Sequence, residues 1–313
     1  MTHNPVADRP VLVTGGAGFI GSHVVRQLVG AGAQVRVLDD MSSGRPENLG
    51  PALARVELIE GDICDLAAVR RAAEGAAIII HLAAMVSVVQ SVEEPLRAQA
   101  VNATGTLNVL EAARAAGVRR VVQASSCAVY GEPERLPVDE TTPPCPLSPY
   151  AATKLAAEQA GQLYTRLYGL ETVALRFFNV YGPRQDPTSP YAAAVPRFIA
   201  ALRAGRQPTI YGDGRQTRDF VYVGDVVRAL WTAATAPGIA GEVFNVGRGE
   251  SVSVVALVET LCDLLGVPCR PEFAPPRPGE VRHSRADVAR FAARAGFCAT
   301  TGLREGLRET LSL

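Results

Sequence analysis

Short apolar runs alternate with longer stretches of helical spacing along the first half of the chain. The apolar runs predict strands at residues 11–14, 34–38, 56–60, 77–81, 118–124 and 172–177. The longest helical stretches between them cover residues 97–116 and 149–168. Strands that alternate with helices are typical of a parallel sheet covered on both faces. We therefore expect an α/β fold with a doubly wound parallel sheet.

The first strand is followed by a glycine-rich turn and then by a helical pattern from residue 22 to residue 30. Gly15 suits the tight turn, Gly18 lets the backbone approach a pyrophosphate, and Gly21 allows the helix to pack on the strand. Asp39 ends the second strand, about twenty positions further on, where an acidic residue binds both ribose hydroxyls and repels a 2′-phosphate. The pattern predicts a Rossmann-type site for NAD rather than NADP.

Prolines mark a change of architecture after residue 177, at Pro183, Pro187, Pro190 and Pro196, and again in residues 271–278. We expect loops and short helices there, forming a smaller C-terminal α/β lobe that binds the substrate. The predicted NAD-binding domain covers residues 1–176 and a return segment at about 216–246. The lobe takes about 177–215 and 247–313.

Tyr150 and Lys154 stand four residues apart, just after Pro149, which is typical of a helix start. A helix places both side chains on one face. An adjacent positive charge favours a phenolate, so we expect Lys154, together with the positive nicotinamide of NAD, to lower the pKa of Tyr150 and to make it a general base. Such a pair is also typical of an ordinary surface contact. Only its context in the fold gives it catalytic meaning.

Composition narrows the class of protein. The 313 residues carry a formal net charge of zero, which gives no support to nucleic acid or an anionic membrane as a partner. The first ten residues do not resemble a secretory signal, and the longest apolar runs are too short to span a bilayer. Six cysteines are scattered without metal-ligand spacing. We expect reduced thiols in a cytoplasmic protein without a metal, with Cys262 and Cys298 in the core.

Several motifs together resemble the extended short-chain dehydrogenase/reductases, and within them the NAD-dependent nucleotide-sugar epimerases and dehydratases. The resemblance covers residues 11–297, nearly the whole chain. It rests on residues 15–21, the pair Asp62 and Ile63, residues 81–84, Asn102, and residues 125–131, 176–183 and 218–221. The resemblance implies that Tyr150, Lys154 and Ser126 are catalytic.

The same resemblance implies two sets of binding residues. The set expected to bind NAD is Gly15, Gly18, Phe19, Ile20, Gly21, Asp39, Asp40, Ser43, Gly44, Asp62, Ile63, Leu82, Ala83, Ala84, Asn102, Ser125, Tyr150, Lys154 and Phe177. The set expected to bind the nucleotide sugar is Ser126, Tyr150, Asn179, Thr209, Tyr211, Arg218, Arg277 and Ser284.

Ordinary structural roles remain open for some of these residues. Ser125 and Ser126 would suit a turn after a strand, and Asn179 a buried amide bonded to backbone. Arg218 would also pair with Asp219 or another carboxylate, although its planar fork suits a diphosphate. Thr209 and Tyr211 would suit plain strand packing. His81 is expected to be structural, since tyrosine takes the proton in this chemistry.

The two residues that directly follow the predicted catalytic Ser126 bear on which reaction is catalysed. Dehydratases of similar sequence carry an acidic pair where this chain has Cys127 and Ala128, and decarboxylases carry glutamate in place of Ala128. Neither residue transfers protons as a carboxyl does, so dehydration and decarboxylation are disfavoured. Epimerisation at C4 through a transient keto-sugar remains.

Two further positions bear on the sugar. Glucuronate epimerases have an arginine where this chain has Asp186, whose charge would repel a sugar carboxylate. Ser284 replaces a bulky tyrosine of glucose-only epimerases and leaves room for an N-acetyl group. The resemblance thus implies a UDP-hexose 4-epimerase. The alternatives are a UDP-glucuronate 4-epimerase, a dTDP-sugar epimerase or reductase, and, from a different class, an NAD-binding redox-sensing regulator.

The resemblance also implies a homodimer formed through the helices at residues 97–116 and 149–168. Close approach of two subunits would be allowed by the alanines at positions 112, 113, 115 and 116. These alanines would equally suit packing on the chain's own sheet.

Overall fold

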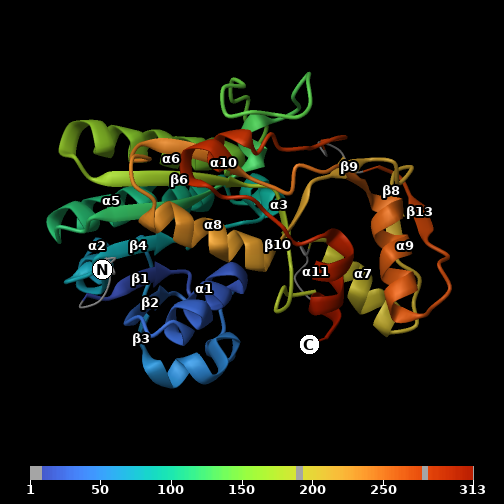
Figure 1. The fold of residues 1–313 in the computed structure, drawn as a ribbon, viewed down its shortest axis with the longest axis horizontal. Coiled ribbons are helices and arrows are strands. Elements are labelled where there is room, and N and C mark those ends of the chain that lie inside the picture. The colour runs from blue at the N-terminus through green and yellow to red at the C-terminus, as the bar shows by residue number, and fades with distance from the viewer. Residues whose placement is uncertain (1–8, 188–192, 277–280, 313) are drawn as a thin grey trace.

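A computed structural model describes residues 9–187, 193–276 and 281–312 of the chain. Figure 1 shows a large sheet with flanking helices, mostly blue to green but with α8 in orange, beside a smaller lobe built mostly from the yellow to red part of the chain. The lobe begins at Asn179, directly after the sixth strand of the large sheet ends at Phe177.

The large sheet has seven strands, all parallel, in the order β11-β6-β5-β4-β1-β2-β3. The strands are β1 (Val11–Thr14), β2 (Val35–Asp39), β3 (Val56–Glu60), β4 (Ile78–His81), β5 (Arg120–Ser126), β6 (Glu171–Phe177) and β11 (Glu242–Val246). Strands β1 and β4 are buried along their whole length, as expected of a sheet covered on both faces. The predicted doubly wound Rossmann-type fold is confirmed.

Helices cover both faces of this sheet (Figure 1). On one face, α1 (Phe19–Gly30) and α8 (Val223–Thr235) share a core with the sheet. On the other, α2 (Leu66–Ala73) and α5 (Gly105–Ala115) do the same, with α6 (Pro149–Tyr168) beside them. The 3-10 helix η1 (Pro46–Arg55) lies between β2 and β3, and α3 (Val88–Glu93) follows β4. Each sheet face is therefore closed by apolar helix faces, and the strand ends remain to form a site.

The helix predicted at residues 97–116 is interrupted. It comprises α4 (Pro95–Ala98), a π-helical segment η2 (Gln99–Thr104) and α5. A π-helical turn holds one extra residue, and such turns are frequent at functional sites. Here the segment carries the buried Asn102.

The lobe consists of short strands and helices around its own core. Its strands pair two by two: β7 (Asn179–Tyr181) with β10 (Phe220–Tyr222), β9 (Thr217–Arg218) with β12 (Val252–Ser253), and β8 (Thr209–Tyr211) with β13 (Glu272–Ala274). Its helices are α7 (Ala194–Arg203), α9 (Val254–Leu265) and α11 (Leu303–Leu311). By contrast, α10 (Ala289–Ala295) lies against the large sheet, where Phe291 stacks on Phe244 with ring centres 4.5 Å apart. The division into two domains stays a prediction, with α10 on the larger one.

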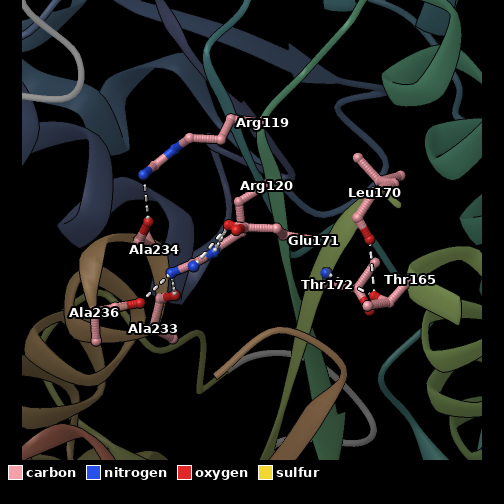
Figure 2. A network of polar contacts seen from close by, with 9 residues as sticks. All are labelled: Arg119, Arg120, Thr165, Leu170, Glu171, Thr172, Ala233, Ala234 and Ala236. Atoms are coloured by element: carbon pink, nitrogen blue, oxygen red, sulfur yellow. Dashed lines mark hydrogen bonds and ion pairs between the residues drawn. The ribbon is translucent and has the colours of Figure 1, made fainter. Parts of the chain in front are cut away.

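A buried arginine fixes α8 at the amino ends of β5 and β6 (Figure 2). The Arg120 Nε donates to Glu171 at 2.8 Å, and its Nη1 donates to the backbone oxygens of Ala233 and Ala236 at 2.9 and 2.7 Å. These oxygens lie at the end of α8, where helical carbonyls lack helical partners. Arg120 therefore stabilises the fold away from the carboxyl ends of the strands.

The prediction that Cys262 and Cys298 lie in the core is right for Cys262 only. Cys262 is buried in the lobe core, but Cys298 is exposed. Cys298 lies in the connection between α10 and α11, which runs over the surface and is held there by a hydrogen bond from Arg228 to the Cys298 carbonyl. Within the described residues, no helix has the length and apolar character needed to cross a bilayer.

Candidate active site

The carboxyl ends of the parallel strands lie along one edge of the large sheet. Thr14, Asp39, His81, Ser126 and Phe177 are the last residues of β1, β2, β4, β5 and β6. Ligands of doubly wound sheets bind at this edge. The residues predicted from five separate stretches of sequence are thus brought to one side of the fold.

The glycine turn between β1 and α1 leaves no room for side chains. Gly15 has a φ of +69°, and a Cβ there would lie 2.6 Å from the Ala83 nitrogen. A Cβ on Gly21 would lie 2.0 Å from the Gly15 oxygen. Gly18 is the N-cap of α1 and supplies no side-chain cap, and the first turn, with Phe19 and Ile20, contains no acidic residue. The positive end of α1 and its backbone N–H groups are therefore suited to an anion.

Asp39 is buried beside this turn. Its Oδ2 accepts a hydrogen bond from the Ala17 N–H at 2.9 Å, and its Oδ1 accepts one from the Met41 N–H at 3.0 Å. Burial raises the pKa of Asp39, and these two hydrogen bonds lower it in part. Each carboxylate oxygen keeps a second lone pair for a hydroxyl group. Gly44 is needed here, since a Cβ on it would lie 2.6 Å from Asp39 Oδ1.

The remaining residues predicted to bind the adenosine half surround Asp39 in sequence or follow β3. Asp40 and Ser43 are exposed, and Asp40 accepts hydrogen bonds from the backbone and side chain of Ser42. Asp62 is exposed and accepts a bond from the Cys64 N–H at 2.8 Å, while Ile63 is buried. Their role in binding stays a prediction.

Asn102 joins the loop after β4 to α6. Its side chain accepts from the Met85 N–H at 2.8 Å and donates to the Met85 oxygen at 3.0 Å and to Thr153 at 3.2 Å. The loop also contains Leu82, Ala83 and Ala84, all partly exposed. Asn102 thus positions backbone beside the glycine turn.

The helix α6 holds Tyr150 and Lys154 on one face. It begins with Pro149, and the side chain of its N-cap, Ser148, accepts a hydrogen bond from the Ala151 N–H. The Lys154 Nζ lies 6.0 Å from the centre of the Tyr150 ring and donates to the Ala124 oxygen at 3.0 Å. This bond fixes the ammonium to the end of β5, next to Ser125 and Ser126.

The expected lowering of the Tyr150 pKa by Lys154 is not found in the chain itself. Burial raises the pKa of Tyr150 to about 12, against a lowering by its hydrogen bond with the Ser126 side chain. Burial also lowers the pKa of Lys154 to about 8. At 6.0 Å from the ring, the ammonium does not offset the desolvation of the phenol.

Ser126 and Cys127 follow one another at the end of β5. The Ser126 Oγ accepts from the Ala128 N–H at 3.1 Å and begins the short 3-10 helix η3 (Cys127–Tyr130). Burial raises the pKa of the Cys127 thiol to about 12, so the thiol stays protonated at neutral pH. Position 127 therefore supplies no acid or base beside the Ser126 hydroxyl. Ser125 instead donates to the buried Glu158.

Two predicted sugar-contacting residues have buried polar atoms without a hydrogen-bond partner in the described part of the chain. They are the Oδ1 of Asn179 and the Oγ of Ser284. Buried polar atoms are normally paired, so these two are available to a ligand. The backbone N–H of Ser284 bonds the Thr217 oxygen at 3.1 Å and holds the segment beside β9.

The other residues predicted for the nucleotide lie in the lobe. Arg218 donates to the backbone oxygens of Thr217 and Arg282. Thr209 and Tyr211 are partly buried in β8, and Arg197 lies over the Tyr211 ring at 5.7 Å. Arg277 lies outside the described residues. Which of these contact a nucleotide stays a prediction.

His81 lies buried between two hydroxyls. Its Nδ1 is 2.7 Å from the Thr14 Oγ1, and its Nε2 is 3.0 Å from the Thr106 Oγ1. Burial lowers the pKa of His81 to about 3, so its ring is neutral. The geometry supports the structural role expected for it.

Two features escaped the sequence reasoning. Lys154 is the only lysine among the 31 basic residues, a signal that a single count would have found. Asp219 is fully buried and accepts from the backbone N–H groups of Arg248, Gly249 and Ala286. It joins three loops of the lobe, and no local pattern announces contacts between segments so distant in sequence.

The residues present fit NAD. The glycine turn and uncapped helix start suit a diphosphate, the buried Asp39 suits a ribose diol, and Tyr150, Lys154 and Ser126 stand at the strand edge between α6 and β5. Fold and site together define an NAD-dependent enzyme of the Rossmann type, in which the catalytic use of Tyr150 and Lys154 stays a prediction.

Comparison with known proteins identifies the family. Residues 11–247 match the model of the NAD dependent epimerase/dehydratase family. The chain is 45% identical, over 304 residues and 96% of both chains, to a UDP-glucose 4-epimerase of Mycolicibacterium smegmatis. It is 34% identical over 313 residues, and 96% of both chains, to a dTDP-glucose 4,6-dehydratase of an Actinoplanes species.

Solved structures similar to this chain also include UDP-sugar 4-epimerases. A UDP-N-acetylglucosamine 4-epimerase from Methanobrevibacter ruminantium, in complex with UDP-N-acetylmuramic acid, has a TM-score of 0.93 and 39% identity, with 97% of each chain covered. A UDP-glucose 4-epimerase from Thermus thermophilus in complex with NAD has a TM-score of 0.87 and 40% identity, with 97% of this chain and 98% of that chain covered. A protein named MoeE5, in complex with UDP-glucuronic acid and NAD, has a TM-score of 0.87 and 38% identity over the same shares.

The chain belongs to the NAD-dependent epimerase/dehydratase family. The predictions of an NAD cofactor and of an isomerase of the epimerase kind are confirmed.

Proposed function

We propose that the protein is a UDP-hexose 4-epimerase that interconverts UDP-glucose and UDP-galactose, and that it also accepts their N-acetylated forms. The observation that carries this proposal is the grouping of Tyr150, Lys154 and Ser126 at the strand edge with no carboxyl group at positions 127 and 128. The similarity to UDP-sugar 4-epimerases over nearly the whole chain supports it.

Tyr150, Lys154 and Ser126 each have a separate role in the proposed reaction. NAD, when bound, supplies reversible two-electron redox chemistry at the sugar carbon. Tyr150 takes the proton from the C4 hydroxyl and returns it, and Lys154 supplies the positive charge that favours the phenolate. Ser126 hydrogen-bonds the same sugar oxygen and positions it. The keto-sugar turns between the two steps, so the hydrogen removed from C4 is returned to the opposite face of that carbon, and Tyr150 returns the proton to the C4 oxygen.

Position 127 argues against dehydration. Loss of water from C5 and C6 needs an acid and a base beside the sugar, whereas the Cys127 thiol is protonated and Ala128 carries no proton to transfer. This separates the chain from the 4,6-dehydratases among its relatives.

The sugar preference rests on two positions. Ser284 places a small side chain with an unpartnered hydroxyl near β9, which supports acceptance of an N-acetyl group. The carboxylate of Asp186 lies 3.8 Å from the Arg45 guanidinium, so part of its charge is balanced. Its repulsion of glucuronate is correspondingly smaller than its charge alone implies, and UDP-glucuronate belongs in the test.

The test is incubation of the purified protein, without added cofactor, with UDP-glucose, UDP-N-acetylglucosamine and UDP-glucuronate in separate reactions, followed by chromatography. We expect the C4 epimers of the first two. Conversion of UDP-glucuronate alone would contradict the assigned sugar. Steady consumption of added NADH would instead indicate a reductase, and bound NAD without any turnover would indicate a regulator.

We also propose a cytoplasmic homodimer. The free state of all six cysteines supports a reducing compartment. Of the two roles left open for the alanines, Ala112 and Ala113 take packing within the chain, because both are buried in its own core. Support comes instead from exposed apolar side chains on α5 and α6, which lie side by side: Leu107, Leu163, Leu167 and Tyr168.

A further inference from the structure

Lys154 is the one lysine in a chain whose permanently charged basic residues are all arginines. Of the 31 basic residues, 30 are arginine. Arginine stays charged at every accessible pH, whereas a buried lysine changes its charge readily. With only 7% of its surface exposed, Lys154 is under pressure to lose its proton, and burial lowers its pKa to about 8. A pKa of about 8 leaves the amine only about one unit from losing its charge at neutral pH, so any attraction that opposes the effect of burial matters.

Glu158 is placed to do this. It follows Lys154 by four residues, so both side chains lie on the same face of α6. Glu158 is buried, and its attraction opposes the effect of burial on the pKa of Lys154. Its carboxylate is held by two parallel bonds from Arg176, at 2.9 and 2.7 Å, and by a bond from Ser125.

The carboxylate also connects the catalytic segments. Arg176 belongs to β6, Ser125 to β5, and Glu158 to α6. Ser125 precedes the predicted catalytic Ser126, and the Ala124 oxygen just before it accepts the Lys154 bond. One buried carboxylate thereby fixes the relative position of the strand that carries the serine and the helix that carries the tyrosine and lysine.

Among the described residues, the titratable groups beside Lys154 in the site add no negative charge at neutral pH, whereas the carboxylates near Glu158 have partners of their own. The His81 ring is neutral, and the hydroxyl of Tyr150 and the thiol of Cys127 are protonated. Tyr130, whose ring lies 4.7 Å from the Arg176 guanidinium, is protonated as well, since burial raises its pKa to about 12. Glu158 and Arg176 also line a polar cavity of about 200 Å³ whose other charged residues are Glu140, Glu242 and Arg290. Two arginines pair with Glu242, and Glu140 accepts a bond from the Asn245 N–H.

We propose that Glu158 is a positioning residue: its carboxylate, held by Arg176 and Ser125, keeps the Lys154 amine in the charged form and fixed beside Tyr150. The consequence for turnover rests on the proposed function. The charge coupling between the two residues does not, and it is measurable without any sugar.

The lone lysine makes a direct measurement possible. Trace acetylation with acetic anhydride modifies only the neutral amine, and Lys154 is the one lysine in the chain. The labelled fraction of the peptide that contains residue 154 is followed by mass spectrometry from about pH 6 to about pH 10. Because this peptide does not contain the N-terminus, its signal is separate from that of the N-terminal amine. The wild-type midpoint should fall near pH 8. In Glu158→Gln we expect it about one unit lower, with labelling at pH 7 about fivefold faster.

Glu171→Gln is the matched control. Glu171 also pairs with a buried arginine, Arg120, at 2.7 Å, but at the amino end of the sheet (Figure 2). The substitution removes an arginine–carboxylate pair whose carboxylate is more exposed than that of Glu158, 38% against 3%, and which lies on β5 and β6 rather than on α6. The Lys154 midpoint should therefore stay at the wild-type value.

A second variant provides the same measurement if Glu158→Gln does not fold. Loss of one member of a buried ion pair is more destabilising than loss of both. If Glu158→Gln does not fold, the double variant Glu158→Gln with Arg176→Gln replaces it, and its midpoint should also lie below that of the wild type. An unchanged midpoint in the variant that folds would overturn the proposal. A lowered midpoint in a protein that converts no UDP-sugar would establish the coupling and contradict the proposed function.

Discussion

The Lys154 ammonium donates a hydrogen bond to the Ala124 oxygen, 3.0 Å away, and so joins α6 to the end of β5. This contact places the tyrosine and lysine of the helix beside the serine of the strand. The local sequence pattern provides only the pair on the helix, and the sheet provides the third member.

Tyr150→Phe should leave NAD binding intact and reduce turnover about 10²- to 10⁴-fold, because only the proton-transferring oxygen is removed. Bound NAD is measured by its release on denaturation, and turnover by chromatography of the nucleotide sugars. Activity close to that of the wild type would exclude Tyr150 as the base.

Lys154→Met should abolish turnover and yet raise stability at neutral pH. Burial lowers the pKa of Lys154 from its usual 10.5 to about 8 in the folded state. At a pH between these two values, unfolding therefore takes up a proton. The buried ammonium lowers the free energy of unfolding most below about pH 8, and this loss of stability disappears above about pH 10.5. The stability gained by the substitution should be larger at pH 7 than at pH 10.5 by about 3 kcal/mol. Urea unfolding of both proteins at the two pH values measures this, and an equal difference at both would refute it.

Gly21→Ala should destabilise the protein by about 1–3 kcal/mol and weaken NAD binding by more than about tenfold, because the new Cβ would lie 2.0 Å from the Gly15 oxygen. The control is Gly30→Ala in the same helix, where a Cβ would meet nothing within 4 Å. That change should be neutral or slightly stabilising. Equal NAD affinity in the two variants, by calorimetry, would contradict the role assigned to the turn.

Ser284→Tyr should remove activity on UDP-N-acetylglucosamine before activity on UDP-glucose, because the added ring fills the space assigned to the N-acetyl group. Ser284→Ala, which adds no volume, should preserve the ratio of the two kcat/KM values. The volume argument would be refuted by an unchanged ratio in the tyrosine variant.

Leu163→Glu combined with Leu167→Glu should convert a dimer to monomers, since both side chains are exposed on α6 and a buried unpaired charge opposes association. Light scattering after size exclusion gives the mass. Leu53→Glu, in η1, is the control and should remain dimeric. A monomeric wild type would contradict the dimer outright.

Local patterns predicted the strands and the site edge well, because each apolar run and the glycine turn carry their information within a few residues. The π-helical turn at Asn102 was missed because one extra residue barely changes the helical spacing. Cys298 was misplaced because burial of a connecting segment depends on its tertiary contacts. The pKa of Tyr150 was predicted to be lowered by Lys154 and by the positive nicotinamide. In the chain itself desolvation raises it, because helical spacing gives the neighbouring charge but not the burial that outweighs it.

Glu158 shows a further limit. Its spacing from Lys154 is visible in the sequence, but its bonds to Ser125 and Arg176 join three elements that only the fold brings together. A buried network of this kind is defined by the sheet order β6-β5 and by the packing of α6 on it.

As the proposed UDP-hexose 4-epimerase, the protein inverts C4 of the sugar and returns the same hydrogen to that carbon. Incubation with UDP-glucose carrying deuterium at C4, in ordinary water and without added cofactor, tests it most directly, with the product followed by NMR. We expect UDP-galactose that retains deuterium at C4. A product with protium at C4, or a 4-keto sugar that has lost its C6 hydroxyl, would contradict it.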